Sequence, residues 1–349
     1  MVESNAAPRG IEPEPLGRWI AEHVPTAHPP FTFALVAAGG SNLTYRVTDA
    51  EGATWALRRG PVGRALATAH DMRREWRIMS ALASSEVPVP ACVVYCDDHN
   101  VNGADFYLME FVDGTVLRTS AGAASFDPTA ALAATTSLID VQVAMHTLDL
   151  GRFGLDDLAR HDDYIGRQLK RWRTQVESGG VREVRVMREL HDRLAAARPP
   201  ELVRPGLAHG DYRFDNTVLG RDHRIAAVLD WELCTIGDPI ADFAWSLQYW
   251  ADPTDDLTFL DDAPTLAPQF ERRASVAERY ARVSGFDLEA LPYYTVFSWW
   301  KQACIVEGVY ARHLHGAAGG MGANADPTAI AARADRLFAR AAELADGVV

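Results

Sequence analysis

Lysine is nearly absent from this chain. Of its 349 residues, 34 are Lys or Arg, and the only lysines are Lys170 and Lys301. Any cation that serves a binding site in the N-terminal half must therefore be arginine. Arginine keeps the charge of lysine but not its compact ammonium geometry, so the choice of phosphate-binding residues is restricted before any motif is considered.

Cysteine and long apolar runs are also scarce. The four cysteines, Cys92, Cys96, Cys234 and Cys304, are scattered, and no second pair or nearby histidine completes a metal site around the first two. We therefore expect four reduced thiols. No stretch reaches the apolar length of a membrane span, and residues 1–17 have no apolar core of the signal-peptide type. A cytoplasmic protein is expected.

Positive charge is in deficit, because the net charge is −13. This balance argues against a nucleic-acid-binding or membrane-binding surface and permits a cationic substrate. The hydrophobic fraction of 48% is ordinary for a globular protein. A chain of this length can bury a large core and is expected to form two lobes.

The most informative stretch runs from residue 207 to 238. It contains His209-Gly210-Asp211, then Asn216 five residues after that aspartate, then two short apolar runs and Asp230. A hairpin-like arrangement would place Asp211, Asn216 and Asp230 near one end of a small ribbon. One aspartate can take a proton from a hydroxyl, while the asparagine and the second aspartate offer hard oxygen ligands for Mg²⁺. Phosphoryl transfer needs this combination. A surface hairpin with acidic turns is the alternative.

This stretch resembles the catalytic and metal loops of the aminoglycoside phosphotransferase family, which has a two-lobed, protein-kinase-like α+β fold. The resemblance implies a tail and short helix over 1–25, a β-rich nucleotide lobe over 26–112 and a helical lobe over 113–349. It also implies that ATP is the co-substrate, that Asp211 is the base and that Asn216 and Asp230 bind Mg²⁺. His209 would be structural, and Arg213 would lie near the γ-phosphate. The metal motif departs from Asp-Phe-Gly and reads Asp230-Trp231-Glu232.

Four further positions are expected to surround the nucleotide phosphates. Gly39, Gly40, Ser41 and Asn42 separate strands expected over 31–38 and 43–48. Such a turn can cover phosphates with backbone N–H groups or can be a plain hairpin, and the resemblance favours the nucleotide loop.

A cation for the phosphates is expected on the next strand, 54–59. Arg58 is the candidate and Arg59 the second choice. Glu75, on a helix expected over 69–82, would pair with Arg58 as in kinases. The alternative is that Glu75 belongs to weak surface ion pairs with neighbouring arginines.

Adenine recognition is expected at the end of the strand 106–111. Met109, Glu110 and Val112 resemble a kinase hinge, with the Glu110 carbonyl and the Val112 N–H facing the base. An edge strand followed by a turn would have the same sequence.

The rest of the chain is predicted to be mostly helical. Asp-Pro pairs at 127–128, 238–239 and 326–327 suit helix starts, where Asp caps free N–H groups and Pro fits the first turn. Asp242 is expected to accept backbone hydrogen bonds and brace the catalytic loop. An Arg-rich pair of helices expected over 162–177 and 181–197 is either a solvated face or the path of an anionic substrate. The helix 293–313, which carries Lys301, is expected to form part of the acceptor pocket.

The predicted function is Mg²⁺-dependent transfer of the ATP γ-phosphoryl group to a small-molecule hydroxyl. Three motifs, GGSNLTY, LRRGP and HGDYRFDN, most resemble the kinase-like domain fused to some acyl-CoA dehydrogenases, which suggests a hydroxyacyl-CoA-type acceptor. An aminoglycoside or amino-alcohol kinase is the first alternative, favoured by the acidic loop 252–262. A catalytically weak, nucleotide-binding regulatory module is the second.

Overall fold

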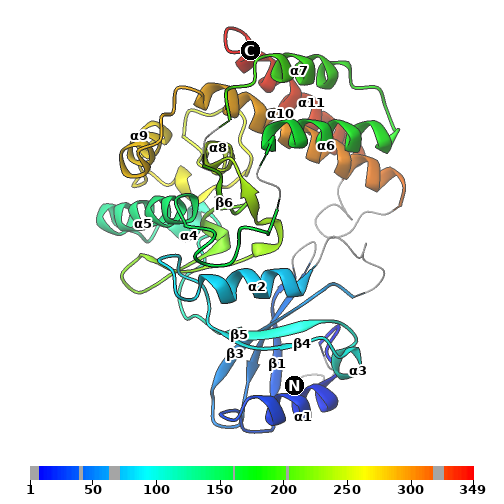
Figure 1. Ribbon diagram of the computed structural model, residues 1–349, viewed down its shortest axis with the longest axis vertical. Coiled ribbons are helices and arrows are strands. Elements are labelled where there is room, and N and C mark those ends of the chain that lie inside the picture. The colour runs from blue at the N-terminus through cyan, green and yellow to red at the C-terminus, as the bar shows by residue number, and fades with distance from the viewer. Residues whose placement is uncertain (1–7, 39–41, 63–70, 160–161, 202–203, 317–325) are drawn as a thin grey trace. The chain divides into compact units, whose positions relative to one another are not determined.

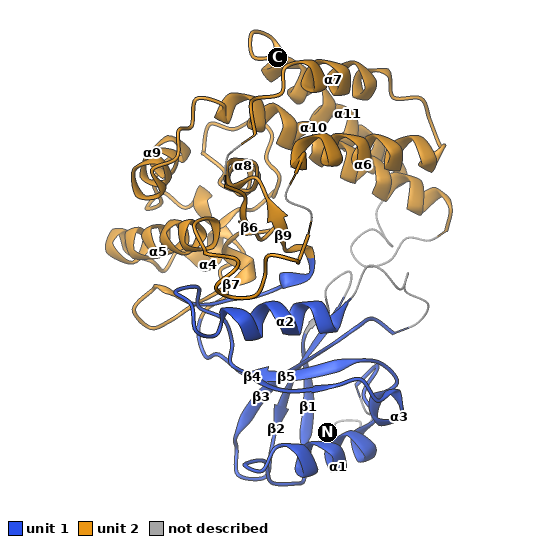
Figure 2. Ribbon diagram, viewed as in Figure 1, with its two compact units in different colours: residues 1–114, 226–232 blue, residues 115–225, 233–349 orange. Residues whose placement is uncertain are grey.

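The computed structural model describes residues 8–38, 42–62, 71–159, 162–201, 204–316 and 326–349. The chain forms two compact units (Figure 2). Unit 1 comprises Met1–Gly114 and Ala226–Glu232, and unit 2 comprises Thr115–Ile225 and Leu233–Val349. The prediction had assigned everything after residue 112 to one helical lobe. The short segment that carries Asp230 instead clusters with unit 1.

A five-stranded antiparallel sheet organises unit 1 (Figure 1). Its order is β1-β2-β3-β5-β4, and the strands are β1 (Thr32–Ala38), β2 (Leu43–Thr48), β3 (Thr54–Arg59), β4 (Cys92–Cys96) and β5 (Phe106–Glu110). Among the described residues of this unit, the helices are α1 (Pro13–His23), α2 (Met72–Leu82) and α3 (His99–Asn102). The bounds of β1, β2, β3 and β5 agree with the sequence prediction to within one residue.

Helix α2 carries a charged residue on its apolar face. Asp71 caps the helix by accepting a hydrogen bond from the Arg74 N–H, as is typical of an N-cap. Glu75 lies one helical turn from Met72 and from Met79, and all three are buried. The helix therefore carries a carboxylate into the unit, where a partner is required.

Unit 2 is mostly helical. Its helices are α4 (Ser120–Ala123), α5 (Pro128–His146), α6 (Tyr164–Gly179), α7 (Arg185–Ala196), α8 (Pro239–Gln248), α9 (Arg273–Ser284), α10 (Leu291–Leu314) and α11 (Pro327–Ala345). Its strands β6 (Gly206–Ala208) and β9 (Thr235–Gly237) pair antiparallel. Unit 2 also holds β7 (Thr217–Leu219) and the 3-10 turns at Phe214–Asn216 and Pro264–Leu266. Most of β8 (Ile225–Val228) and of the 3-10 turn at Trp231–Leu233 belongs to unit 1. The α+β class is thus confirmed.

The three Asp-Pro helix starts are confirmed by their hydrogen bonds. Asp127, Asp238 and Asp326 each accept backbone N–H bonds in the first turn of α5, α8 and α11. Helices α8 and α11, with α6, α7 and α10, surround a core that includes Leu169, Met187, Trp300 and Phe338. In the described part of the chain, no helix is both long and apolar enough to cross a membrane.

Candidate active site

Arg58 on β3 connects two carboxylates in unit 1. Its Nε donates to Glu75 Oε2 at 2.8 Å, and its Nη2 donates to Asp230 Oδ1. The predicted pairing with Glu75 is therefore present. Burial by itself would lower the pKa of Arg58, but the two carboxylates outweigh it and hold that pKa above its usual value. Burial in turn raises the pKa of Glu75 against the opposing charge of Arg58.

The second choice for the strand cation, Arg59, serves another purpose. Its guanidinium donates to the backbone carbonyls of Gly10 and Asn102. Arg59 therefore ties the N-terminal segment to the sheet. Of the two arginines, Arg58 is the one that contacts carboxylates of the candidate site.

Asp230 is held in an uncommon backbone conformation. Its φ is 63°, in the left-handed region that costs an L-residue other than glycine about 1–2 kcal/mol. Aspartate tolerates this region better than most residues because its short side chain can hydrogen-bond locally. This conformation changes the chain direction between β8 and the following 3-10 turn. The Asp230 carboxylate there contacts Arg58.

Asn42 lies in the same polar network. Its amide nitrogen donates to Glu75 Oε1 and to Glu232 Oε2, both at 3.0 Å. The sequence analysis did not assign a role to Glu232, although it stands two residues after Asp230. The other expected loop residues, Gly39, Gly40 and Ser41, lie outside the described residues.

The expected hinge positions end β5. Met109 is buried and pairs with Ala56 of β3, whereas Glu110 is exposed. Glu110 N–H donates to Ala91 O at 2.8 Å. Within the described chain, the Val112 N–H makes no hydrogen bond, so it is available to an acceptor atom of a ligand.

The loop that carries Asp211 follows β6 in unit 2. Gly210 has a φ of +85°, and a Cβ at this position would lie 2.9 Å from the Leu233 carbonyl oxygen. Only glycine suits such a close approach. The Asp211 N–H donates to His209 Nδ1 at 3.3 Å, so His209, which is fully buried, supports the loop from inside.

Asp242 on α8 braces this loop, as predicted. Its carboxylate accepts hydrogen bonds from the backbone N–H groups of His209 at 3.1 Å and Gly210 at 2.9 Å. His146 Nε2 lies 3.1 Å from the same carboxylate, and His146 Nδ1 lies 2.6 Å from the Tyr280 hydroxyl. Burial opposes ionisation of Asp242, but the His146 contact and the backbone donors lower its pKa overall.

Asn216 fixes the side chain of Asp211. Its amide nitrogen donates to the Asp211 carbonyl at 2.8 Å and to Asp211 Oδ2 at 2.9 Å. Because both contacts use the nitrogen, the amide oxygen of Asn216 is left as an acceptor. Hard cations such as Mg²⁺ bind oxygens of this kind, so Asn216 can orient Asp211 and offer a metal ligand at once.

Arg213 is shared between two carboxylates. Its Nε lies 3.0 Å from Asp215 Oδ1 and 3.3 Å from Asp211 Oδ1, and its guanidinium stands 4.8 Å from the Tyr249 ring centroid. Burial, with the charge and hydrogen bond of Asp211, holds the pKa of Tyr249 well above its usual value. The Tyr249 hydroxyl therefore stays protonated beside the negative charge of Asp211. The sequence analysis missed Asp215 and Tyr249, although Asp215 lies inside the HGDYRFDN motif.

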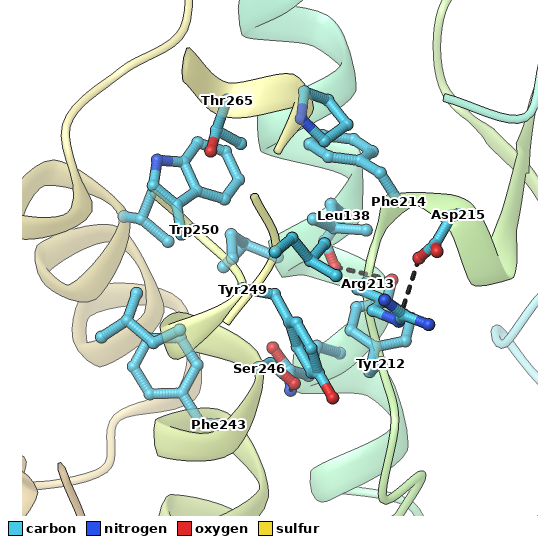
Figure 3. Close-up of a pocket in the computed structure, with 16 residues that line it drawn as sticks. Leu138, Tyr212, Arg213, Phe214, Asp215, Phe243, Ser246, Tyr249, Trp250 and Thr265 are labelled. Carbon is cyan, nitrogen blue, oxygen red and sulfur yellow. Dashed lines mark hydrogen bonds and ion pairs between the residues drawn. The ribbon is translucent and has the colours of Figure 1, made fainter. Parts of the chain in front are cut away.

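A small cavity lies behind these residues. Figure 3 shows Arg213, Asp215 and Tyr249 at its edge, with Phe243 and Trp250 among its apolar walls. Its volume of about 30 Å³ suffices for roughly one water molecule. The cavity is therefore too small to hold an acceptor substrate.

The acidic loop 252–262 is largely engaged by the protein itself. Asp255 pairs with Arg273, and Asp261 pairs with Arg333. Asp262 accepts hydrogen bonds from Ser120. The observation that favoured a polycationic acceptor is weakened, because these carboxylates already have partners.

Two residues of α10, the helix expected to form part of the acceptor pocket, bind other parts of unit 2. Trp300 is fully buried and donates to the Met187 carbonyl at 3.0 Å. Glu307 is paired with Arg182 at 2.6 Å. Lys301, on the same helix, has no such partner among the described residues.

A model of the phosphotransferase enzyme family matches residues 32–292. The chain is 34% identical over 290 residues to acyl-CoA dehydrogenase family member 11 of Gallus gallus, and 34% identical over 289 residues to family member 10 of Mus musculus. Each match covers 80% of this chain but only 36% and 26% of the relative. The chain thus matches about a third of the length of the first relative and about a quarter of the second.

Solved structures match over nearly the whole chain. A candidate aminoglycoside phosphotransferase from Ralstonia eutropha is 29% identical, with a TM-score of 0.79 and coverage of 96% of this chain and 98% of that protein. Choline kinase of Cryptosporidium parvum is 12% identical, with a TM-score of 0.63 and coverage of 95% of both chains. The second likeness concerns the fold alone.

Proposed function

This chain belongs to the phosphotransferase enzyme family, and we propose that it transfers the γ-phosphoryl group of ATP to a hydroxyl of a small molecule with the help of Mg²⁺. It has the two-lobed, kinase-like α+β fold of small-molecule kinases. One observation carries the proposal above all: Arg58 joins Glu75 to Asp230. A buried cation between a helix carboxylate and a strand-end carboxylate suits nucleotide phosphates and their metal.

The proposed role of Asp211 is to orient the acceptor hydroxyl and take its proton as the oxygen attacks the γ-phosphorus. The two hydrogen bonds from Asn216 and the braced backbone at Gly210 support this role, because they restrict the carboxylate to one orientation. As the acceptor oxygen bonds to the γ-phosphorus, the bond from that phosphorus to the β–γ bridging oxygen breaks and ADP is released. The proton of the acceptor hydroxyl passes to Asp211. Positioning of this kind supplies much of the catalysis in phosphoryl transfer.

The residues fit a magnesium ion. The described chain holds no group of three or more His, Cys, Asp or Glu side chains that could bind a metal ion by themselves, but Mg²⁺ is usually held by one or two protein oxygens together with phosphates and water. Asn216, through its amide oxygen, and Asp230 are the proposed ligands. When bound, the ion would neutralise charge on the phosphates.

Nucleotide recognition is proposed for the remaining residues of unit 1. Arg58, held by Glu75, would contact the phosphates, and the loop of Gly39, Gly40, Ser41 and Asn42 would cover them. The unengaged Val112 N–H, with the Glu110 carbonyl and the Met109 side chain, would face adenine. Arg213 would contact the γ-phosphoryl group from unit 2.

The proposed acceptor is a hydroxyacyl-CoA-type metabolite. The support is the match to acyl-CoA dehydrogenase family members 10 and 11, which extends over most of this chain. An aminoglycoside or amino-alcohol acceptor is the rival, and its main sequence argument is weakened by the ion pairs of the loop 252–262. A weak regulatory module is the other rival, and the presence of Asp211, Asn216 and Asp230 argues against it.

The test combines binding with turnover. Wild type and Asp230→Asn are unfolded thermally with and without Mg-ATP. A ligand at a hundredfold excess over its Kd stabilises the native state by about 2.7 kcal/mol, and we expect this gain in wild type and a smaller gain in the variant. Phosphorylated product is then sought by mass spectrometry with hydroxybutyryl-CoA, kanamycin and choline as acceptors. No stabilisation of wild type at millimolar Mg-ATP, or no product with any acceptor, would contradict the proposal.

A further inference from the structure

The ammonium of Lys301 is a cation without a polar partner. It lies on α10, with Nζ 3.8 Å from the ring centroid of Trp245 and 5.9 Å from that of Trp172. Within the described residues it makes no ion pair and no hydrogen bond. An ammonium has three N–H donors, and an aromatic face attracts its charge without serving those donors as an oxygen would.

Its neighbour Trp245 also has an unused donor. Trp245 on α8 is only 5% exposed, and its indole N–H has no hydrogen-bond partner within the described chain. Buried indole N–H groups usually have an acceptor. The Lys301 ammonium and the Trp245 indole N–H therefore both lack an acceptor atom within the described chain.

This place adjoins the proposed catalytic loop. The ring centroid of Trp245 lies 5.9 Å from that of Tyr249, and the Arg213 guanidinium of the loop stands 4.8 Å from the Tyr249 centroid. Burial disfavours the protonated form of Lys301, the charges of Asp242 and Asp211 favour it, and the charge of Arg171 disfavours it. Asp242 already accepts hydrogen bonds from the loop backbone and His146, and Asp211 accepts them from Asn216. Within the described chain, Lys301 is thus a cation near this loop that has no carboxylate partner of its own.

We propose that Lys301, together with the Trp245 N–H, binds a negatively charged oxygen group of the acceptor and so selects anionic over cationic acceptors. The inference rests on the proposed function, because it takes Asp211 as the residue that receives the acceptor hydroxyl. Lys301 is a specificity residue in this scheme, and the proton transfer stays with Asp211.

Charge and shape both disfavour an amine at this position. A ligand ammonium would compete with Lys301 for the Trp245 face and would be repelled by Lys301 and Arg171. An anion would supply the missing acceptors. Burial lowers the pKa of Lys301 to about 8 despite the nearby carboxylates, and an anion bound beside it would favour the charged form.

Calorimetric binding without ATP tests the inference directly. Hydroxybutyryl-CoA is the anionic probe and kanamycin the cationic probe, each titrated into wild type, Lys301→Met and Lys301→Arg. Lys170→Met is the matched control, since Lys170 is exposed on α6. We expect wild type to prefer the anion. A charge-assisted hydrogen bond corresponds to about 10- to 100-fold in affinity, so Lys301→Met should weaken anion binding by that factor. Lys301→Arg should restore much of it, and Lys170→Met should change nothing.

A second variant and a second measurement guard against misfolding. Lys301→Gln removes the charge while keeping a polar side chain, and retention of the Mg-ATP thermal shift shows that each variant is folded. Trp245→Phe keeps the aromatic face and removes the N–H, and a several-fold loss of anion affinity is expected. Equal anion binding by wild type and either folded neutral variant overturns the inference, as does preference of wild type for kanamycin or no binding of hydroxybutyryl-CoA.

Steady-state kinetics can show whether the Lys301 assignment or the proposed function is wrong. If wild type phosphorylates hydroxybutyryl-CoA, Lys301→Met should raise the KM of that acceptor and leave the KM of Mg-ATP unchanged. Turnover with an unchanged acceptor KM would contradict the Lys301 assignment alone. Charge-dependent binding of the probe without any phosphoryl transfer would contradict the proposed function and leave the Lys301 site intact.

Discussion

Arg58 donates a hydrogen bond to Asp230, a residue 172 positions later in the chain. The same guanidinium also binds Glu75, so three residues from β3, α2 and the turn after β8 form one charged group. The group contains one cation and two carboxylates. A cation from outside, such as the metal of Mg-ATP, would balance this charge once Arg58 turned toward the phosphates.

Replacing Arg58 by Lys should weaken nucleotide binding. Lysine keeps the charge but loses the fork that reaches Glu75 and Asp230 together. We expect the KM for Mg-ATP to rise by about tenfold, which corresponds to about one strong hydrogen bond. Arg59→Lys is the matched control, because Arg59 binds backbone carbonyls only. Equal KM values for the two variants would count against Arg58 as the phosphate-binding residue.

Replacing Asp211 by Asn should abolish most turnover without affecting nucleotide binding. General-base assistance typically contributes about 10²- to 10⁴-fold, and an amide cannot accept the proton. We expect kcat to fall within that range while the Mg-ATP thermal shift stays unchanged. Asp222→Asn, at an exposed turn, serves as the control. Turnover of Asp211→Asn within a few-fold of wild type would remove Asp211 from the role of base.

The left-handed backbone at Asp230 should be visible in stability. Asp230→Ala and Asp230→Gly both remove the carboxylate, so their difference reports the backbone alone. Glycine adopts a φ of 63° without steric cost. We therefore expect the free energy of unfolding of Asp230→Gly to be about 1 kcal/mol higher than that of Asp230→Ala. Chemical denaturation measures the difference. A more stable alanine variant would mean that the residue adopts another φ in solution.

Asp242 should make stability depend on pH. Its pKa is lowered in the folded state: burial opposes the charged form, but the contacts with His146 and the loop N–H groups outweigh burial. A carboxyl whose folded pKa is depressed contributes stability above its unfolded pKa of about 3.9 and loses it as pH falls through the folded pKa.

Asp242→Asn should therefore cost about 3–5 kcal/mol near neutral pH, because it removes one partner of a buried polar network. The gap between wild type and variant should shrink below about pH 4. Denaturant unfolding between pH 7 and 3 measures it, with Asp140→Asn, at the half-buried Arg279 pair, as the control. A gap that stays constant with pH would contradict the lowered pKa.

Local chemistry made much of this protein readable from its sequence. The strands β2 and β3 begin and end where alternation and glycine predicted, and the Asp-Pro pairs cap helices as expected. These features depend on residues within a few positions of one another. The scarcity of lysine likewise identified Arg58 and Arg59 as the two possible strand cations.

Only the tertiary structure decided which of these residues meet. Arg58 and Arg59 are adjacent in sequence, yet one contacts Glu75 and Asp230 and the other the N-terminal segment, because neighbouring side chains of a strand leave it on opposite faces. The clustering of residues 226–232 with unit 1, the place of Arg213 over the Tyr249 ring and that of Lys301 over the Trp245 ring depend on contacts between distant segments. Periodicity and motif spacing carry no information about such contacts, since these are set by packing of the whole chain.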